Sequence, residues 1–166
     1  MGQRIEGAIV FSGRVTPAQL DVPDSTIDNA AVKASAAIAA SKLEHQHKPA
    51  YSQESDTTAA AEDRVIHTVL GATGKVTGFS AGCVVACIGD STVTVDLHKN
   101  GSSMLSSTIT IDSGDAAYDV VDATVDPAKE DVVLDDVIEV VITVSAGTGT
   151  LGKGVFAQAV IEEDAA

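Results

Sequence analysis

The sequence predicts an all-β protein: an antiparallel jelly-roll-type β-sandwich of about eight strands, with an N-terminal extended arm that contains a short helix. Short runs rich in Val, Ile and Thr fill the chain after residue 63, and turn signals separate them at intervals of roughly 8–12 residues. Several runs alternate apolar and polar side chains with the period of two that is typical of strands. Apolar residues make up 45% of the 166 residues but aromatic residues only 3%, so the core has to consist of Val, Ile, Ala and Leu.

The first 63 residues differ in composition from the rest, and we expect residues 1–63 to form an arm and residues 64–166 to form the β-sandwich body. The arm is rich in Ala, Ser, Asp and Gln and poor in large apolar side chains. A short helix is expected in it, beginning either at Ser41, which can form a capping box with Glu44, or further back at Asp28. Its apolar stripe is narrow, so such a helix needs a surface on which to dock.

The body divides into eight expected strands. In chain order they are residues 64–70, 75–79, 83–89, 92–98, 103–111, 117–125, 137–145 and 154–162. The sharpest turn signal is Asn100-Gly101, because both residues tolerate the positive φ angles of a type I′ turn, and it predicts a hairpin between the flanking runs.

Alternation assigns the faces of the strongest strands. One face of three strands is continuously apolar: Val93, Val95 and Leu97 in the first, Ile138, Val140, Ile142 and Val144 in the second, and Val155, Ala157, Ala159 and Ile161 in the third. The opposite face of the last two is only half polar. One face can therefore fill the core while the other meets a neighbouring subunit or the arm.

Three motifs resemble enzyme signatures, but none has the required context. Gly147–Gly152 matches G-x-G-x-x-G, yet only 14 residues follow it and they have the pattern of a strand, not of a helix. A flexible hairpin loop, or a loop that lets a neighbouring backbone approach closely, is the simpler interpretation. The run from Gly71 to Lys75 lacks residues that a P-loop needs, and Gly89-Asp90-Ser91 lacks the glycines of a nucleophile elbow. We therefore expect no enzyme and no cofactor.

Cys83 and Cys87 lie four residues apart within a predicted strand, where their Cα atoms would be roughly 13 Å apart. A disulfide needs Cα atoms within about 7 Å. Two reduced, largely buried thiols are expected.

Acidic residues cluster in the predicted loops. They are Asp112 with Asp115, Asp119 with Asp122, Asp126 with Glu130 and Asp131, and Asp135 with Asp136. None has the spacing of an EF-hand loop, so we expect solvated loop edges, with structural calcium as the alternative.

The net charge of −14 is unevenly distributed. Residues 1–60 carry five Lys/Arg against seven Asp/Glu, whereas residues 61–166 carry five against 17. An acidic body repels phosphate backbones, so no nucleic acid partner is expected. The chain contains no stretch of about 18 apolar residues and no recognisable signal peptide, so no membrane partner is expected either.

Glu44, His45 and His47 form the most conspicuous cluster of potential ligands. A mononuclear metal site would need a third protein ligand, and His67 or Glu54 are conceivable. Because the segment has little intrinsic structure, we interpret both histidines as contacts at an interface and assign no metal ion.

The segment Ile38–Gln53, "IAASKLEHQHKPAYSQ", resembles the anchor segment of tailed-phage head decoration proteins, also called cement proteins, and of head fibres. The turn glycines and strands of the body resemble the jelly-roll head of the same family, so that the resemblance covers roughly residues 25–163. It implies a non-enzymatic virion protein on the outer capsid surface, which strengthens the shell as a homotrimer bridging subunits of the major capsid protein.

The resemblance also implies which residues anchor the chain. The residues of the anchoring or trimer-contact segment would be Ile38, Ser41, Lys42, Leu43, His45, Gln46, His47 and Tyr51. Val141, Phe156 and Val160 would be candidates for an inter-subunit face of the body. The alternative is a carbohydrate-binding β-sandwich module or fibre head, although the chain has no Trp and only five Phe and Tyr residues for a sugar platform.

Overall fold

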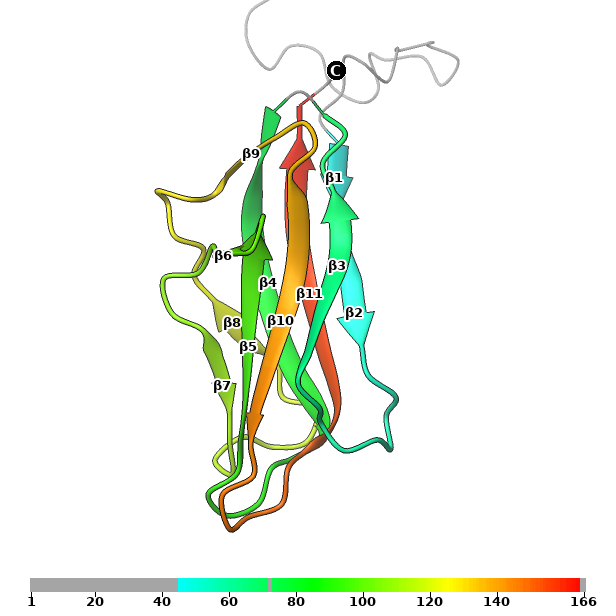
Figure 1. Cartoon of the computed structure of the whole chain (residues 1–166), viewed down its shortest axis with the longest axis vertical. Coiled ribbons are helices and arrows are strands. Elements are labelled where there is room, and N and C mark those ends of the chain that lie inside the picture. Colours follow the sequence, from blue (N-terminus) through cyan, green and yellow to red (C-terminus); the bar gives the residue numbers. More distant parts are fainter. Residues whose placement is uncertain (1–44, 72, 165–166) are drawn as a thin grey trace, which may run out of the picture. The chain divides into compact units, whose positions relative to one another are not determined.

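The computed structural model describes residues 45–71 and 73–164. The helix expected in the arm and most of the arm itself lie outside these residues. Within them the chain forms eleven strands, arranged as two antiparallel sheets packed face to face (Figure 1). The predicted all-β antiparallel sandwich is confirmed.

Sheet A has two long central strands with short strands along both edges. Strand β11 pairs with β4; β1 and β2 pair with the outer side of β11, and β8 and β9 with the outer side of β4. Its strands are β1 (His45–His47), β2 (Ala50–Ser52), β4 (Thr73–Val85), β8 (Val121–Ala123), β9 (Asp131–Val133) and β11 (Lys153–Glu163).

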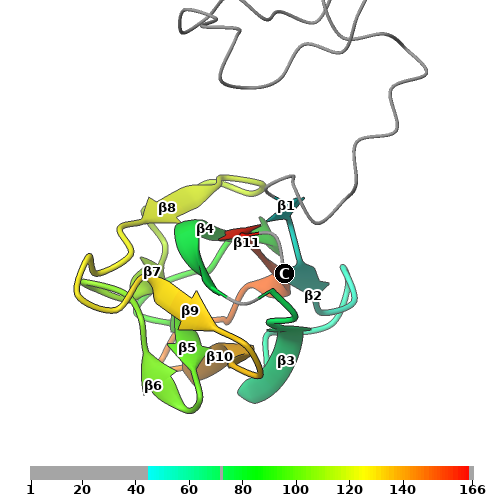
Figure 2. The ribbon, with the colours of Figure 1, turned by 90° about the horizontal axis from the view of Figure 1, so that it is seen from above.

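Sheet B follows the order β3-β10-β5, and β6 and β7 pair with the outer side of β5. Its strands are β3 (Glu62–Thr68), β5 (Thr92–Lys99), β6 (Ser102–Ser103), β7 (Ile109–Ile111) and β10 (Val137–Ser145). The chain crosses between the sheets from β3 to β4, from β4 to β5 and from β10 to β11, as in jelly-roll sandwiches. Seen from above, β4 and β11 of sheet A face β5 and β10 of sheet B (Figure 2).

The core lies between the two sheets and consists of the side chains that the alternation assigned to it. The buried residues of the strongest strands include Val93, Val95, Leu97, Ile138, Val140, Ile142, Val155, Ala157, Ala159 and Ile161. Val144, at the end of its strand, is only half buried. Phe79 is the one fully buried aromatic residue of the described chain, so aliphatic packing holds the sheets together.

The hairpin predicted at Asn100-Gly101 is confirmed. Both residues have positive φ, 51° and 78°, and they join β5 to β6 with Lys99 opposite Ser102. This is the two-residue turn that matches the twist of the flanking strands.

Strand β4 corrects the predicted boundaries, because it joins the runs 75–79 and 83–89 into one strand and ends at Val85. The small residues between them, Ser80 to Gly82, do not form the turn expected there. They remain extended because they pair with β11. Another segment lies against Gly82, where a Cβ would come within 2.1 Å of the carbonyl oxygen of Asp119. Glycine here allows a close backbone approach.

The middle of the body has shorter strands than predicted. Run 103–111 divides into β6 and β7, run 117–125 contributes only β8, and β9 forms where no strand was expected. These strands pair at the outer edges of the sheets, where a few ladder hydrogen bonds suffice. The described residues contain no helix that could cross a membrane.

Residues 45–63, assigned to the arm from the sequence, enter the sandwich in this structure. Strands β1 and β2 pair with β11, with His47 opposite Ile161 and Tyr51 opposite Ala157. Tyr51 also packs against the core. The described chain thus begins at the end of the sandwich where β11 terminates (Figure 1).

Candidate functional site

The residues expected to make contacts divide into two groups. Ile38, Ser41, Lys42 and Leu43 lie outside the described residues. His45, Gln46 and His47 lie on β1 and Tyr51 lies on β2, where His45 and Gln46 are exposed and the other two are half-buried. Nothing in the described part of the chain tests their contacts with another subunit.

His47 points towards the inter-sheet side of β1. Its partner in the register is Ile161, a fully buried residue of β11, and paired residues of an antiparallel ladder share a face. Glu163 lies two residues further along β11, on the same face, and is also buried. The register therefore brings the imidazole of His47 next to a buried carboxylate.

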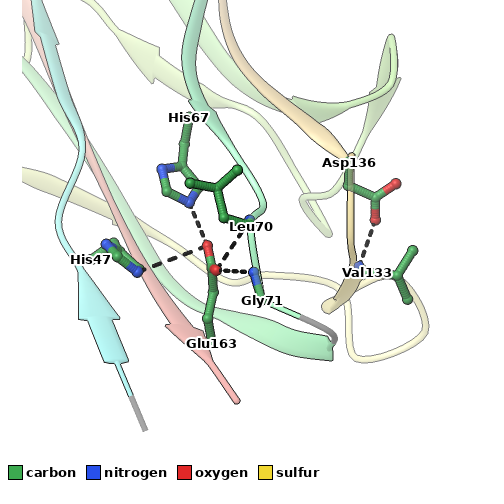
Figure 3. Close-up of polar contacts among 7 residues, drawn as sticks. All are labelled: His47, His67, Leu70, Gly71, Val133, Asp136 and Glu163. Carbon is green, nitrogen blue, oxygen red and sulfur yellow. Dashed lines mark hydrogen bonds and ion pairs between the residues drawn. The ribbon is translucent and has the colours of Figure 1, made fainter. Parts of the chain in front are cut away.

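Glu163 is the centre of the cluster, and Figure 3 shows the groups that converge on it. Its Oε2 accepts hydrogen bonds from the backbone N–H groups of Gly71 (2.6 Å) and Leu70 (3.2 Å). Its Oε1 lies 2.5 Å from Nε2 of His67 and 3.9 Å from Nε2 of His47. The carboxylate is 3% exposed.

A β-bulge brings His67 into this cluster from the other sheet. The register of β3 against β10 shifts between Ile138 and Glu139, so that Val65 pairs with Glu139 and His67 with Ile138. In a regular strand His67, two residues after Val65, would lie on the same outer face as Val65. The bulge turns its side chain inward, as bulges do where a strand must re-aim a residue.

The rings of His47 and His67 lie against one another, with centroids 5.0 Å apart and planes inclined at 35°. Ligand atoms of these two histidines and of Glu163 all lie within 4.8 Å of one another. The cluster therefore joins β1 and β11 of sheet A to β3 of sheet B at one end of the sandwich.

The Glu163 carboxylate is ionised in these surroundings. Burial raises its pKa, but the hydrogen bonds from His67 and from the two backbone N–H groups outweigh burial, so the pKa lies below its ordinary value. In the described part of the chain its ion-pair partners are the two histidines, and no Lys or Arg reaches it. A buried negative charge without a fixed positive partner is unusual in a protein interior.

A second polar cluster lies beside β2. The Tyr51 hydroxyl donates to Glu62, which also accepts from Arg64. Burial and then the hydrogen bond to Glu62 raise the pKa of Tyr51. This cluster fastens β2 to the start of β3, and we assign it no chemistry.

The enzyme-like motifs serve the fold. The glycines of 147–152 permit the close approach of a neighbouring backbone, as expected: a Cβ on Gly149 would lie 2.1 Å from the carbonyl oxygen of Ile88. Ser91 is fully buried, and its hydroxyl lies 2.6 Å from the carbonyl oxygen of Thr150. That geometry stabilises the loop and hides the hydroxyl from a substrate.

Both cysteines are buried free thiols, as predicted. Their sulfurs lie closer to one another than the sequence implied, since β4 ends before Cys87 and the chain turns back there. A Cβ on Gly152 would lie 3.3 Å from each sulfur.

The clustered aspartates hold their own turns. Oδ1 of Asp112 accepts from the N–H of Gly114 (2.6 Å), and Asp136, only 9% exposed, accepts from the N–H of Val133 (2.9 Å) and from Asn100 (2.6 Å). Figure 3 includes the Val133 contact. Short carboxylates bonded to nearby backbone are a common turn device.

Glu163 was not singled out from the sequence, although a signal for it exists. It continues the inward parity of Val155, Ala157, Ala159 and Ile161, so it is an acid at a core position. His67 could not be assigned in this way, because the bulge that turns it inward depends on pairing with a distant strand.

No family model matches the chain, and no curated protein matches it. Among solved structures it is similar to a chain titled Desmodium yellow mottle tymovirus, with a TM-score of 0.33 and 12% sequence identity. That likeness covers 98% of this chain and 95% of the other. It is too slight to support a conclusion about function.

Proposed function

We propose that this chain is a structural virion protein that decorates the outer surface of a phage capsid and stabilises it as a homotrimer bridging subunits of the major capsid protein. The observation that carries the proposal is the anchor-like segment Ile38–Gln53, whose second half forms the edge of sheet A. Residues 1–44 therefore join the body through strands that are firmly paired with β11.

The arrangement suits a mechanism based on multivalency. Each chain of a trimer offers one attachment segment, and once one segment has bound, the others are held near their sites at high effective concentration. Apolar residues such as Ile38 and Leu43 would supply roughly 1.5–3 kcal/mol each when fully buried against the capsid.

The distribution of charge agrees with attachment through the N-terminal part of the chain. Residues 1–60 carry a net charge of −2, from five Lys/Arg and seven Asp/Glu, and residues 61–166 carry −12, from five and 17. The nearly neutral part can lie against another protein, while the acidic body stays in solvent.

The outer face of sheet A offers a surface for contact between copies. Half-buried Phe156 and Val120, which is 59% exposed, line a groove of about 350 Å³ there. Exposed apolar residues around a groove are typical of protein contacts.

The test removes residues 1–44, which include the first part of the anchor-like segment, and leaves every strand of the sandwich in place. Chains covering residues 1–166 and 45–166 are compared for binding to capsids assembled from the major capsid protein of the same genome. We expect the shorter chain to fold but to bind at least about tenfold more weakly, because it lacks the apolar residues of the segment. Equal binding by both chains would overturn the attachment part of the proposal.

Light scattering of the purified full chain tests the oligomer. A trimer of the 16.8 kDa chain is expected. A stable monomer that also fails to bind capsids would favour the other candidate, a carbohydrate-binding module or fibre head.

One observation favours that second candidate. Tyr118, in the loop before β8, is 69% exposed and has a positive φ of 65°. Exposed aromatic rings are the usual platforms for sugars. Binding on a glycan array that is lost in Tyr118→Ala would support this candidate.

A further inference from the structure

We propose that His47, His67 and Glu163 form a binding site for a divalent transition metal ion, with Zn²⁺ the best match. The inference is independent of a role on the capsid. It departs from the interpretation of the sequence, which assigned no metal ion to the histidine segment.

The set of donor atoms suits Zn²⁺. Two imidazole nitrogens and one carboxylate oxygen are a known three-residue ligand set for Zn²⁺, which leaves the fourth position open for water or another ligand. The Nε2 atoms of both histidines point to the same oxygen, Oε1 of Glu163, at 2.5 and 3.9 Å (Figure 3).

The distances from the two histidines to Glu163 are close to those of a tetrahedral site. Ligands of a tetrahedral Zn²⁺ site with bonds of about 2.0–2.1 Å lie roughly 3.3 Å from one another. Binding would lengthen the His67–Glu163 distance and shorten the His47–Glu163 distance, each by less than about 1 Å. Side-chain rotation can provide such changes without breaking a strand pair, since His47 is 39% exposed at an edge strand.

The groups around the Glu163 carboxylate orient it towards the two histidines. The N–H groups of Leu70 and Gly71 hold Oε2, so that Oε1 is left facing the two rings. Hydrogen bonds of this kind orient metal-ligating carboxylates. Gly71 allows the approach, because a Cβ there would lie 2.9 Å from Oε2.

The location indicates what the ion would do. His47 and Glu163 belong to neighbouring strands of sheet A, and His67 belongs to sheet B. An ion bound to all three would connect the sheets and fix β1, the strand through which residues 1–44 join the body. It would therefore hold the two sheets together where the described chain begins, with its fourth position open.

Isothermal titration of the untagged, chelator-treated full chain with Zn²⁺ tests the site. We expect one ion per chain, with a dissociation constant of about 10 μM or below. His47→Ala, His67→Ala and Glu163→Gln should each weaken binding by at least about tenfold, because each removes one ligand.

His98→Ala is the matched control, since His98 also lies beside a carboxylate, Asp96 (3.0 Å), but on β5 and away from the cluster. It should leave binding unchanged. No binding by the original chain, binding that survives all three ligand variants, or an equal loss in His98→Ala would each overturn the proposal.

Two further measurements separate loss of ligation from loss of folding. Circular dichroism should show a native sheet spectrum for His47→Ala, because that side chain lies at a half-exposed edge. Co²⁺, used as a spectroscopic substitute, should give the absorption of a tetrahedral N/O site in the original chain and in His98→Ala, but not in His47→Ala. A folded His47→Ala chain with an unchanged Co²⁺ spectrum would exclude His47 as a ligand.

Discussion

Cys83 illustrates how burial fixes the chemistry of a single residue. Burial, then the neighbouring Cys87 and Asp115, raise the pKa of its thiol to about 11. The folded state therefore prefers the neutral thiol, whereas the unfolded chain loses this proton above its ordinary pKa of about 9. The resulting contribution to stability is present below pH 9 and is lost as the pH rises towards 11.

We accordingly predict that the free energy of unfolding falls by about 1 kcal/mol between pH 8 and pH 10 on account of Cys83 alone. Urea denaturation of the original chain and of Cys83→Ala measures it, because the variant lacks this part of the pH dependence. If the free energy of unfolding fell equally with pH in the two chains, the pKa of the thiol would be the same in the folded and unfolded states.

Gly149 and Gly78 form a pair that tests close packing of the backbone. A Cβ on Gly149 would lie 2.1 Å from the carbonyl oxygen of Ile88, whereas one on Gly78 would meet Val160 at an ordinary 3.6 Å. Gly149→Ala should cost about 1–3 kcal/mol, because the loop must shift. Gly78→Ala should change stability by less than about 1 kcal/mol. Thermal or urea unfolding compares them, and equal costs would contradict the loop geometry.

Residue patterns of period two were sufficient to find the core but not the cluster. Leu97 and Ile138 could be placed inside because each belongs to a long alternating run. His67 could not, since its direction depends on a bulge that forms only when β3 pairs with β10, some 70 residues later in the chain. His47, His67 and Glu163 come from β1, β3 and β11, so their meeting is a property of the fold.

At the scale of strands, boundaries that a local pattern defines could be predicted, whereas boundaries that depend on a distant segment could not. The limits of β10 match the predicted run 137–145, because one strong pattern defines it. The sequence predicts two strands in place of β4, because Ser80 to Gly82 have the composition of a turn. Their extended form depends on pairing with the distant strands β11 and β8. Strands β1 and β2 are three residues long, too short to show a period.

These two short strands protect the outer edge of β11, which would otherwise expose unpaired backbone groups along a long apolar strand. The N–H of Gln53 donates to the carbonyl of Val155 (2.8 Å), and the N–H of Ala159 donates to that of Pro49 (3.0 Å). Residues 45–53 are therefore part of the body's stability, whatever residues 1–44 do.

Two truncations test this role. Residues 45–166 should unfold at a urea concentration close to that of the full chain. Residues 54–166 should be less stable by more than about 2 kcal/mol, because several hydrogen bonds and the burial of Tyr51 are lost. They should also associate as concentration rises, through the exposed edge of β11. Equal stability of the two truncated chains would show that β1 and β2 contribute nothing.

At the scale of the whole molecule, most of the net charge of −14 lies after residue 60. The salt dependence of capsid binding therefore shows whether the N-terminal part or the acidic body makes the contact. If the nearly neutral N-terminal part makes the contact, its small net charge contributes little long-range attraction to the capsid. Salt should then weaken binding little, and it should screen the repulsion between neighbouring acidic bodies on one capsid. If the acidic body itself made the contact, it would need a basic partner surface, and salt would weaken the complex strongly.

We therefore predict that raising NaCl from about 50 to about 500 mM changes the affinity of the full chain for capsids by less than about threefold. Binding isotherms at several salt concentrations measure the slope. Reversing acids of the body, for example Asp122→Lys with Glu139→Lys, is the control, and it should leave the affinity at high salt unchanged because neither residue belongs to the attachment segment. A loss of affinity of more than about tenfold at high salt would place the acidic body at the capsid, and the orientation proposed above would then have to be reversed.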